Sequence, residues 1–189
     1  MGPLDITAAV FGVLCVALYA RQNIWSWPTG LVQVGLSIYL FYTAKLYADV
    51  GLYIIFFGLQ LYGWYHWARG TRDDLPLPVV SIRATEALVW LVVAAGGIVA
   101  LGHSLVRWTD AALPFWDSAI AVLSLIAQYL LARKVLENWL VWMIVDVLGI
   151  GVYWTKDLHA IAILHGLFLV LAVYGYVSWK RALSAPAPG

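Results

Sequence analysis

Long apolar segments, separated by short stretches that hold most of the charges, constrain the fold of this chain more than any other feature. An α-helix needs about 20 predominantly apolar residues to cross the hydrocarbon core of a bilayer. Hydrophobic residues make up 63% of the 189 residues and charged residues only 11%, whereas soluble domains carry about 25% charged residues. We therefore expect an all-α integral membrane protein. Its seven expected transmembrane helices cover residues 5–20, 27–43, 47–67, 85–102, 114–132, 138–154 and 158–179.

Net charge and cysteine content argue against other classes of protein. The formal net charge is +1, so no strongly basic surface points to nucleic acid. Cys15 is the single cysteine and can form no disulfide within the chain. No Lys or Arg precedes the first apolar segment, which we therefore interpret as a retained helix and not as a signal peptide.

The distribution of Lys and Arg between the two sets of loops predicts the orientation in the membrane. Loops on the side of the C-terminus carry eight such residues: Arg21, Arg69, Arg72, Arg83, Arg133, Lys134, Lys180 and Arg181. The opposite loops carry three: Lys45, Arg107 and Lys156. Because Lys and Arg are enriched in cytoplasmic loops, we expect the N-terminus outside and the C-terminus in the cytoplasm.

An internal repeat predicts the arrangement of the helices. A shift of 112 residues aligns several uncommon residue types without a gap: Asp5 with Asp117, Arg21 with Arg133, Trp27 with Trp139, Tyr62-Gly63 with Tyr174-Gly175, and Trp67 with Trp179. We expect a 3+1+3 architecture with two parallel three-helix repeats, as in SWEET-type transporters. The expected parts are residues 1–68 (first repeat), 69–106 (polar linker and linker helix), 107–181 (second repeat) and 182–189 (disordered tail).

The segment 137–147 combines two indoles with one carboxylate inside an apolar helix. Trp139, Trp142 and Asp146 follow the spacing i, i+3 and i+7, so they share one helical face. An ionisable group midway along a membrane helix is costly unless it faces protein or water, which favours a functional role for Asp146. The alternative is that Asp146 only accepts hydrogen bonds from neighbouring helices.

Further candidate binding residues are Gln33, Gln60, Gln128 and Tyr39, in the parts of the helices where the two repeats differ. Trp64, near the end of the helix 47–67, is the last candidate. Together with the helical face of Asp146, they suit a flat aromatic cation that bears hydroxyl groups, because indole faces attract cations and amides both donate and accept. Each has a simpler alternative: the glutamines can bond only between helices, and Trp64 can belong to an aromatic belt at the membrane surface.

Enzyme and metal motifs are not found in the sequence. The four histidines have no i, i+4 spacing and no second cysteine exists, so we expect no metal site and no cofactor. No nucleophile elbow, zinc-protease motif or phosphate-binding loop is present, so we expect no catalytic residues. A small membrane enzyme or scaffold is the less favoured alternative to a transporter.

Four stretches resemble the PnuC family of nicotinamide riboside transporters: residues 62–67, 113–118, 133–134 and 137–142. The resemblance covers nearly the whole chain. It implies a homotrimer in the bacterial inner membrane, without an enzymatic activity of its own, that takes up nicotinamide riboside for NAD biosynthesis by facilitated diffusion. It also implies that a cytoplasmic kinase traps the substrate by phosphorylation.

Asp146 departs from the family pattern, because enterobacterial-type nicotinamide riboside carriers have an asparagine there. Other branches of the family carry thiamine or riboflavin. Nicotinamide riboside and thiamine are both cations, so the carboxylate does not choose between them, whereas neutral riboflavin gains less from it. The substrate therefore stays open between nicotinamide riboside, thiamine and, third, riboflavin.

Overall fold

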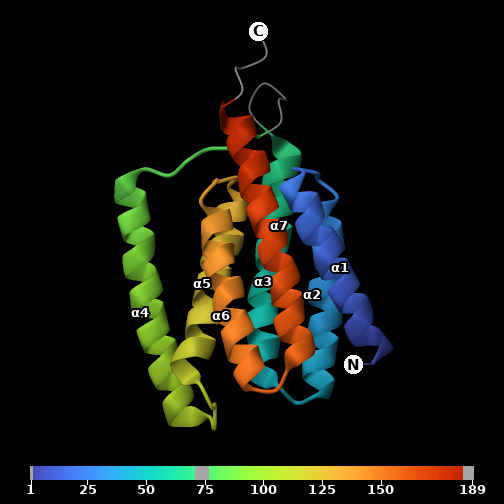
Figure 1. The fold of residues 1–189 in the computed structure, drawn as a ribbon, viewed down its shortest axis with the longest axis vertical. Coiled ribbons are helices and arrows are strands. Elements are labelled where there is room, and N and C mark those ends of the chain that lie inside the picture. Colours follow the sequence, from blue (N-terminus) through green and yellow to red (C-terminus); the bar gives the residue numbers. More distant parts are fainter. Residues whose placement is uncertain (1, 71–76, 185–189) are drawn as a thin grey trace.

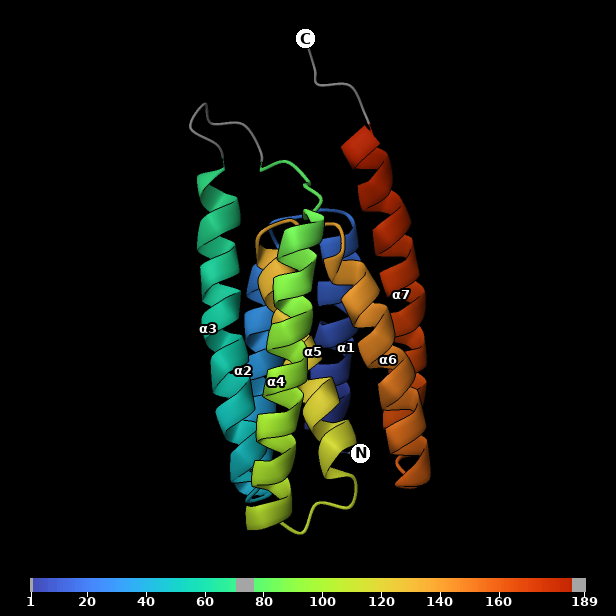
Figure 2. The ribbon, with the colours of Figure 1, turned by 90° about the vertical axis from the view of Figure 1, so that its left-hand side faces the viewer.

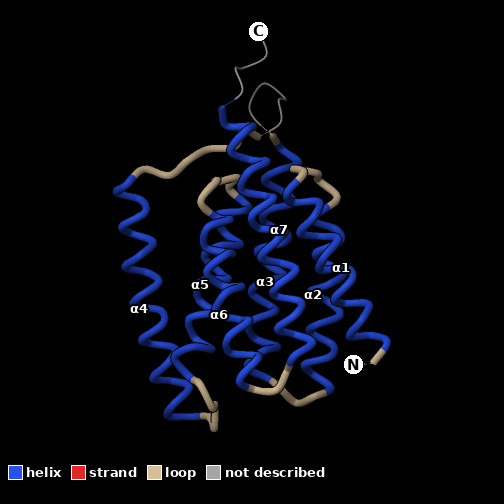
Figure 3. Tube along the Cα trace, in the orientation of Figure 1, coloured by secondary structure: helices blue, strands red, loops and turns tan. Residues whose placement is uncertain are grey.

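The computed structural model describes residues 2–70 and 77–184. Regular structure within these ranges is helical, apart from one isolated parallel bridge between Val80 and Val135 (Figure 3). The helices are α1 (Pro3–Ala20), α2 (Ser26–Thr43), α3 (Tyr47–Arg69), α4 (Ala84–Trp108), α5 (Pro114–Ala132), α6 (Asn138–Thr155) and α7 (His159–Ser184). The all-helical class and the number of helices expected from the sequence are thus confirmed for the described residues.

Two boundaries differ from the expected ones by more than two residues. Helix α4 continues past residue 102 to Trp108, and α7 continues to Ser184, so residues 182–184 are helical where a disordered tail was expected. Long amphipathic side chains explain why polar ends can remain helical, since Arg107 and Arg181 can extend their charges away from the apolar segment. Residues 185–189 and part of the polar linker, 71–76, lie outside the described residues.

Six helices form a closed ring. Contacts join α1 to α2, α2 to α3, α3 to α5, α5 to α6, α6 to α7, and α7 back to α1. Helix α4 lies outside this ring and packs on α5, as Figures 1 and 2 show from two directions. Helices α1, α3, α5 and α7 run in the same direction, and the two termini lie at opposite ends of the molecule (Figure 1). We refer to the end that holds the last turn of α7 as the C-terminal end.

Five helices are long and apolar enough to cross a membrane by length and composition: α1, α4, α5, α6 and α7. The other two, α2 and α3, have 18 and 23 residues but contain more amide, hydroxyl and aromatic side chains. Gln33 and Ser37 lie in α2, and Asp49 and Gln60 lie in α3. Membrane helices tolerate such residues where they face other helices instead of lipid.

Corresponding turns in the two halves of the chain have the same backbone geometry. Gln22 and Lys134 have positive φ angles of 55° and 54°, and Lys45 and Asp157 have 60° and 57°. Each pair is separated by the 112 residues of the sequence shift. Backbone bonds match as well: the amide of Gln22 donates to the carbonyl of Tyr19, and the amide of Lys134 donates to that of Leu131, both at 2.9 Å.

Candidate functional site

Asp146 lies midway along α6 and is paired with a histidine of α7. Its Oδ1 is 2.9 Å from Nδ1 of His165, close enough for the ring N–H to donate to the carboxylate. Asp146 is only 3% exposed. The imidazole also stacks on Tyr153 of α6, with ring centroids 5.3 Å apart and an interplanar angle of 15°. The carboxylate therefore has a fixed partner, as expected for an ionisable group in the middle of a membrane helix.

Sequence reasoning did not identify His165 as a candidate site residue. The histidines were considered only as metal ligands, and sequence cannot show which faces of α6 and α7 meet. One signal was available: His165 lies well inside the apolar segment 158–179, where any ionisable group suggests a function.

Gln60 and Gln128 meet at a residue that sequence reasoning also missed, Tyr19. The Tyr19 hydroxyl donates to Oε1 of Gln60 at 2.6 Å, and the Gln128 side chain lies beside the same hydroxyl. The three side chains come from α1, α3 and α5 and are all buried. Because α1 and α3 are not neighbours in the ring, this contact crosses the interior of the bundle.

Gln128 has donor capacity left over in this cluster. Among the described residues, its Nε2 is buried and has no hydrogen-bond partner. Such a donor is costly to bury unless something accepts from it. A hydroxyl or amide group of a bound molecule would satisfy it.

Gln33 lies on the opposite side of the ring from α6. Its Nε2 donates to Oγ of Ser37, one turn further along α2, at 3.1 Å. Gln33 and Phe168 of α7 both pack against Gly12 of α1, and Phe168 makes an edge contact with the His165 ring. A short chain of contacts thus connects Gln33 to the Asp146–His165 pair.

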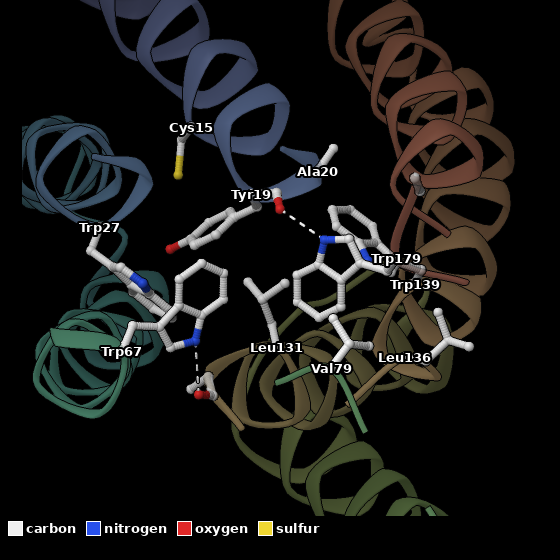
Figure 4. Packing of buried hydrophobic residues seen from close by; sticks show 12 residues of the cluster. Cys15, Tyr19, Ala20, Trp27, Trp67, Val79, Leu131, Leu136, Trp139 and Trp179 are labelled. Atoms are coloured by element: carbon white, nitrogen blue, oxygen red, sulfur yellow. Dashed lines mark hydrogen bonds between the residues drawn. The ribbon is translucent and has the colours of Figure 1, made fainter. Parts of the chain in front are cut away.

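Trp139 belongs to a layer of four indoles at the C-terminal end of the ring. It makes an edge contact with Trp179, with centroids 5.5 Å apart, and Trp27 makes the corresponding contact with Trp67 at 5.3 Å. Indole N–H groups of α3 and α7 bond to the adjacent helix of the other half: Trp67 donates to the carbonyl of Ala132 and Trp179 to that of Tyr19, both at 3.0 Å (Figure 4). We call these four side chains the indole layer.

Each indole of α2 and α6 in this layer packs directly on a glycine. The ring of Trp27 covers Gly63, and the ring of Trp139 covers Gly175, with no room for a Cβ atom at either glycine. Trp139 is therefore buried in packing, while Trp142 is half-buried against the same cluster. Both indoles thus contribute to packing in this structure.

The remaining two predicted site residues lie apart from the interior. Tyr39 is 57% exposed, and Trp64 is 39% exposed on a shallow part of the α3 surface with Leu61 and Tyr65. The structure thus brings Gln60 and Gln128 together at Tyr19 and gives Asp146 a partner. It does not bring Tyr39 or Trp64 to them.

The interior arrangement consists of three levels along the ring axis. The Asp146–His165 pair and Gln33 lie near the middle, Tyr19, Gln60 and Gln128 lie closer to the C-terminal end, and the indole layer closes that end. Such an interior can neutralise a cation, exchange hydrogen bonds with amides or hydroxyls, and exclude water at one end. The groups in this interior are therefore suited to binding a small polar or cationic molecule.

Comparisons with known proteins identify the class to which this fold and interior belong. A model of the family described as "Nicotinamide mononucleotide transporter" matches residues 2–181. The chain therefore belongs to this family of membrane transporters, and its relatives are transporters, not enzymes. The resemblance to PnuC proteins seen in the sequence is confirmed.

Individual relatives match over nearly the whole chain. The nicotinamide riboside transporter PnuC of Escherichia coli (strain K12) is 29% identical over 93% of this chain and 84% of its own length. The riboflavin/roseoflavin transporter RibM of Streptomyces davaonensis is 27% identical over 93% of this chain and 83% of its own. The crystal structure of the vitamin B3 transporter PnuC has a TM-score of 0.77 at 26% identity, covering 95% of this chain and 81% of that one.

Proposed function

We propose that this protein takes up nicotinamide riboside, a precursor of NAD, across the bacterial inner membrane by facilitated diffusion. The observation that carries the proposal is the buried Asp146 carboxylate held by His165 inside the helical ring. A carboxylate at this depth balances the positive charge of a pyridinium ring. The nearby amides of Gln33, Gln60 and Gln128 can bond the ribose hydroxyls and the carboxamide. Relatives named for nicotinamide riboside support the same substrate.

The proposed topology has seven spans, with the N-terminus outside and the C-terminal end of the ring in the cytoplasm. The excess of Lys and Arg at the C-terminal end supports this orientation. The matching φ angles at positions 112 residues apart support two parallel three-helix repeats joined by α4. Contacts of α1 with α7 and of α3 with α5 are related in the way a twofold axis between the repeats requires.

Transport follows by rocking of one repeat against the other around the interior site. We propose that the end closed by the indole layer is the cytoplasmic one and that a substrate reaches Asp146 from the opposite, outer end. Tyr39, Trp64, Trp139 and Trp142 are proposed to contact the substrate ring only after the helices move, because the first two are exposed and the others packed. A cytoplasmic kinase then traps the released substrate by phosphorylation.

The proposed assembly is a homotrimer embedded in lipid. Helix α4 supports it, because α4 packs on α5 alone and presents exposed apolar side chains such as Leu88, Leu91 and Val92 to its surroundings. A helix in this position can contact both lipid and a neighbouring subunit without disturbing the ring.

Thiamine is the second candidate substrate, because the carboxylate at position 146 does not distinguish it from nicotinamide riboside. Position 146 holds a carboxylate, which departs from the asparagine expected in enterobacterial-type nicotinamide riboside carriers. Thiamine is also a cation and gains from the same charge. Riboflavin is neutral, and it stays in the comparison because RibM is a relative over most of the chain.

Calorimetric titration of the detergent-purified protein with nicotinamide riboside, thiamine and riboflavin tests the substrate. We expect binding of nicotinamide riboside, weakened about tenfold or more in Asp146→Asn, since a buried hydrogen-bonded charge contributes about 1.5–3 kcal/mol. Asp157→Asn is the matched control, because Asp157 is exposed in a turn at φ 57° and asparagine tolerates that conformation.

The same titration distinguishes the alternatives. Heat with thiamine alone would keep the fold and the transport function but change the substrate. Equal affinity of wild type and Asp146→Asn for nicotinamide riboside would reduce Asp146 to a packing residue.

A further inference from the structure

The linker that precedes α4 is attached to the turn between α5 and α6. The amide of Val80 donates to the carbonyl of Lys134 at 3.0 Å, and the amide of Leu136 donates back to the carbonyl of Val80 at 2.8 Å. Glu137 accepts from the hydroxyl of Ser81 and, at 3.2 Å, from the amide of Ile82. We call residues 77–82 the strap. These bonds fasten the strap to the second half of the chain.

Lys134 connects this turn to the first half of the chain. Its Nζ donates to Oε1 of Gln22 at 3.1 Å and to the carbonyl of Leu77 at 2.8 Å, and it lies 4.6 Å from the centroid of a Trp67 ring. Lys134 is only 5% exposed. The ammonium is thus buried where both halves, the strap and the indole layer meet.

The contacts of Lys134 differ from the others that cross this end. The indole N–H bonds of Trp67 and Trp179 go to backbone carbonyls and anchor large packed rings. Lys134 instead holds Gln22 through the tip of a long flexible side chain, which can release its partners by rotation. Among the described contacts between the halves at this end, it is therefore the one best suited to break reversibly.

We infer that Lys134 is the gating residue of the C-terminal end: it holds this end closed through Gln22 and Trp67, and it must release both before a substrate can leave there. The strap travels with the turn that carries Lys134, since it is bonded to that turn and not to Gln22. The inference rests on the proposed transport function, because it specifies which contact the transport cycle breaks.

The chain contains its own reporter for this opening. Cys15, the single cysteine, is buried in α1 with its thiol 3.2 Å from the carbonyl of Ser26. It packs in the same cluster as Tyr19 and Trp27 (Figure 4), and it lies one helical turn before Tyr19 in α1, further from the C-terminal end. A charged, membrane-impermeant thiol reagent applied at the C-terminal end can reach Cys15 once that end opens.

The experiment measures the rate at which a methanethiosulfonate reagent labels Cys15 in membrane vesicles. Right-side-out and inside-out vesicles are compared, so that the reagent reaches one face of the protein at a time. A tag after Gly189 identifies the face that carries the C-terminal end. We expect Lys134→Met to be labelled about tenfold faster than wild type from that face. This corresponds to a loss of about 1.4 kcal/mol in the free energy that favours the closed state over the open one. The exposed Lys180→Met is the matched control, and Cys15→Ser gives the background.

A second variant covers the case in which Lys134→Met does not fold. Gln22→Gly removes the acceptor, and glycine adopts the φ of 55° at this position without strain. It should also be labelled faster than wild type, and the double variant should show no further increase over Lys134→Met, because without the ammonium there is no contact with Gln22 left to lose.

Unchanged labelling in the folded variants would overturn the inference. So would an equal increase from both faces or an increase in Lys180→Met, since either indicates general loosening. Failure of the substrate proposal is distinguishable: a protein that binds no nicotinamide riboside but shows the expected labelling retains the gate and loses the substrate.

Discussion

The two turns at the C-terminal end share a backbone but have different side chains. In turn 20–26, the Trp25 side chain is exposed and the Gln22 side chain accepts a bond from Lys134. In turn 132–138, the corresponding residues are Glu137 and Lys134, and both side chains bond to the strap. Backbone hydrogen bonds and left-handed residues are nevertheless the same in both. The two turns therefore share one backbone conformation, while their side chains determine which other segments each turn can bind.

The difference has a topological cause. The chain leaves α3 at this end, and residues 77–82 bond to the turn after α5 before α4 begins and packs on α5. The strap is therefore hydrogen-bonded directly to the turn that follows α5, while it reaches the corresponding turn 20–26 through the Lys134 ammonium. The two turns share their backbone geometry, but within the described residues the strap forms its backbone bonds with only one of them, so the closure of this end is asymmetric.

The largest expected effect concerns a feature that both halves share, the packing of an indole ring directly against a glycine. A Cβ at Gly63 would lie 1.9 Å from Trp27, and one at Gly175 would lie 2.6 Å from Trp139. We expect Gly63→Ala to lower the free energy of unfolding by about 3 kcal/mol and Gly175→Ala by about 2 kcal/mol, as overpacking usually costs about 1–3 kcal/mol. Thermal unfolding in detergent measures both.

Two glycines in the same helices provide matched controls. Gly58 of α3 and Gly166 of α7 have no atoms near a built Cβ, so Ala should leave stability unchanged or raise it by up to about 1 kcal/mol through helix propensity. Losses as large in Gly58→Ala and Gly166→Ala would contradict the packing explanation.

A middle-sized effect is expected from pH, and only in the turn that holds a lysine. Burial lowers the pKa of Lys134 from the ordinary 10.5 to about 8. Its ammonium faces Gln22, the Leu77 carbonyl and the Trp67 ring, with Arg133 and Glu137 beside it in the turn. Between pH 8 and 10.5 the unfolded chain binds the proton more tightly than the folded one, so stability rises with pH over that window.

The measurement compares wild type with Lys134→Met, which has no proton to lose. From pH 8 to 10.5 the free energy of unfolding of wild type should rise by about 2 kcal/mol relative to that of the variant. This is less than the whole pKa difference would give, because the hydrogen bonds of the ammonium offset part of the cost of burying it. A constant difference over this range would mean that Lys134 keeps an ordinary lysine pKa. Lys180→Met, which changes an exposed lysine, should leave the pH dependence as in wild type.

The smallest effect tests the strap itself. Glu137→Ala removes the acceptor for Ser81 and Ile82 and should cost about 1 kcal/mol, the usual net contribution of a hydrogen bond. Trp25→Ala changes the equivalent, exposed position and should stay within about 0.5 kcal/mol. Equal losses in the two variants would show that the strap adds nothing to the second turn.

Helices and overall class could be predicted from the sequence because an apolar run of membrane length has few other outcomes. Facing was harder. Helices that are apolar on all sides give no amphipathic signal, so the outward positions of Tyr39 and Trp64 could not be read from their spacing. The same limit concealed His165 and Tyr19, whose roles depend on which helices adjoin.

Trp139 illustrates how a correct observation can support an incomplete interpretation. Its alignment with Trp27, and that of Gly63 with Gly175, was visible in the sequence. That each indole covers the glycine of its own half required the structure. Asp146 was the opposite case, since the cost of a buried carboxylate demanded a partner before any partner was known.

The closed ring also determines the direction from which a compound can arrive. Every helix in it contacts both neighbours, and α4 covers part of the outside of α5. A molecule dissolved in the lipid therefore meets packed helices all around the described part of the ring. We expect cargo to enter from water at an end of the ring, so that the architecture favours water-soluble molecules before any side chain recognises a functional group.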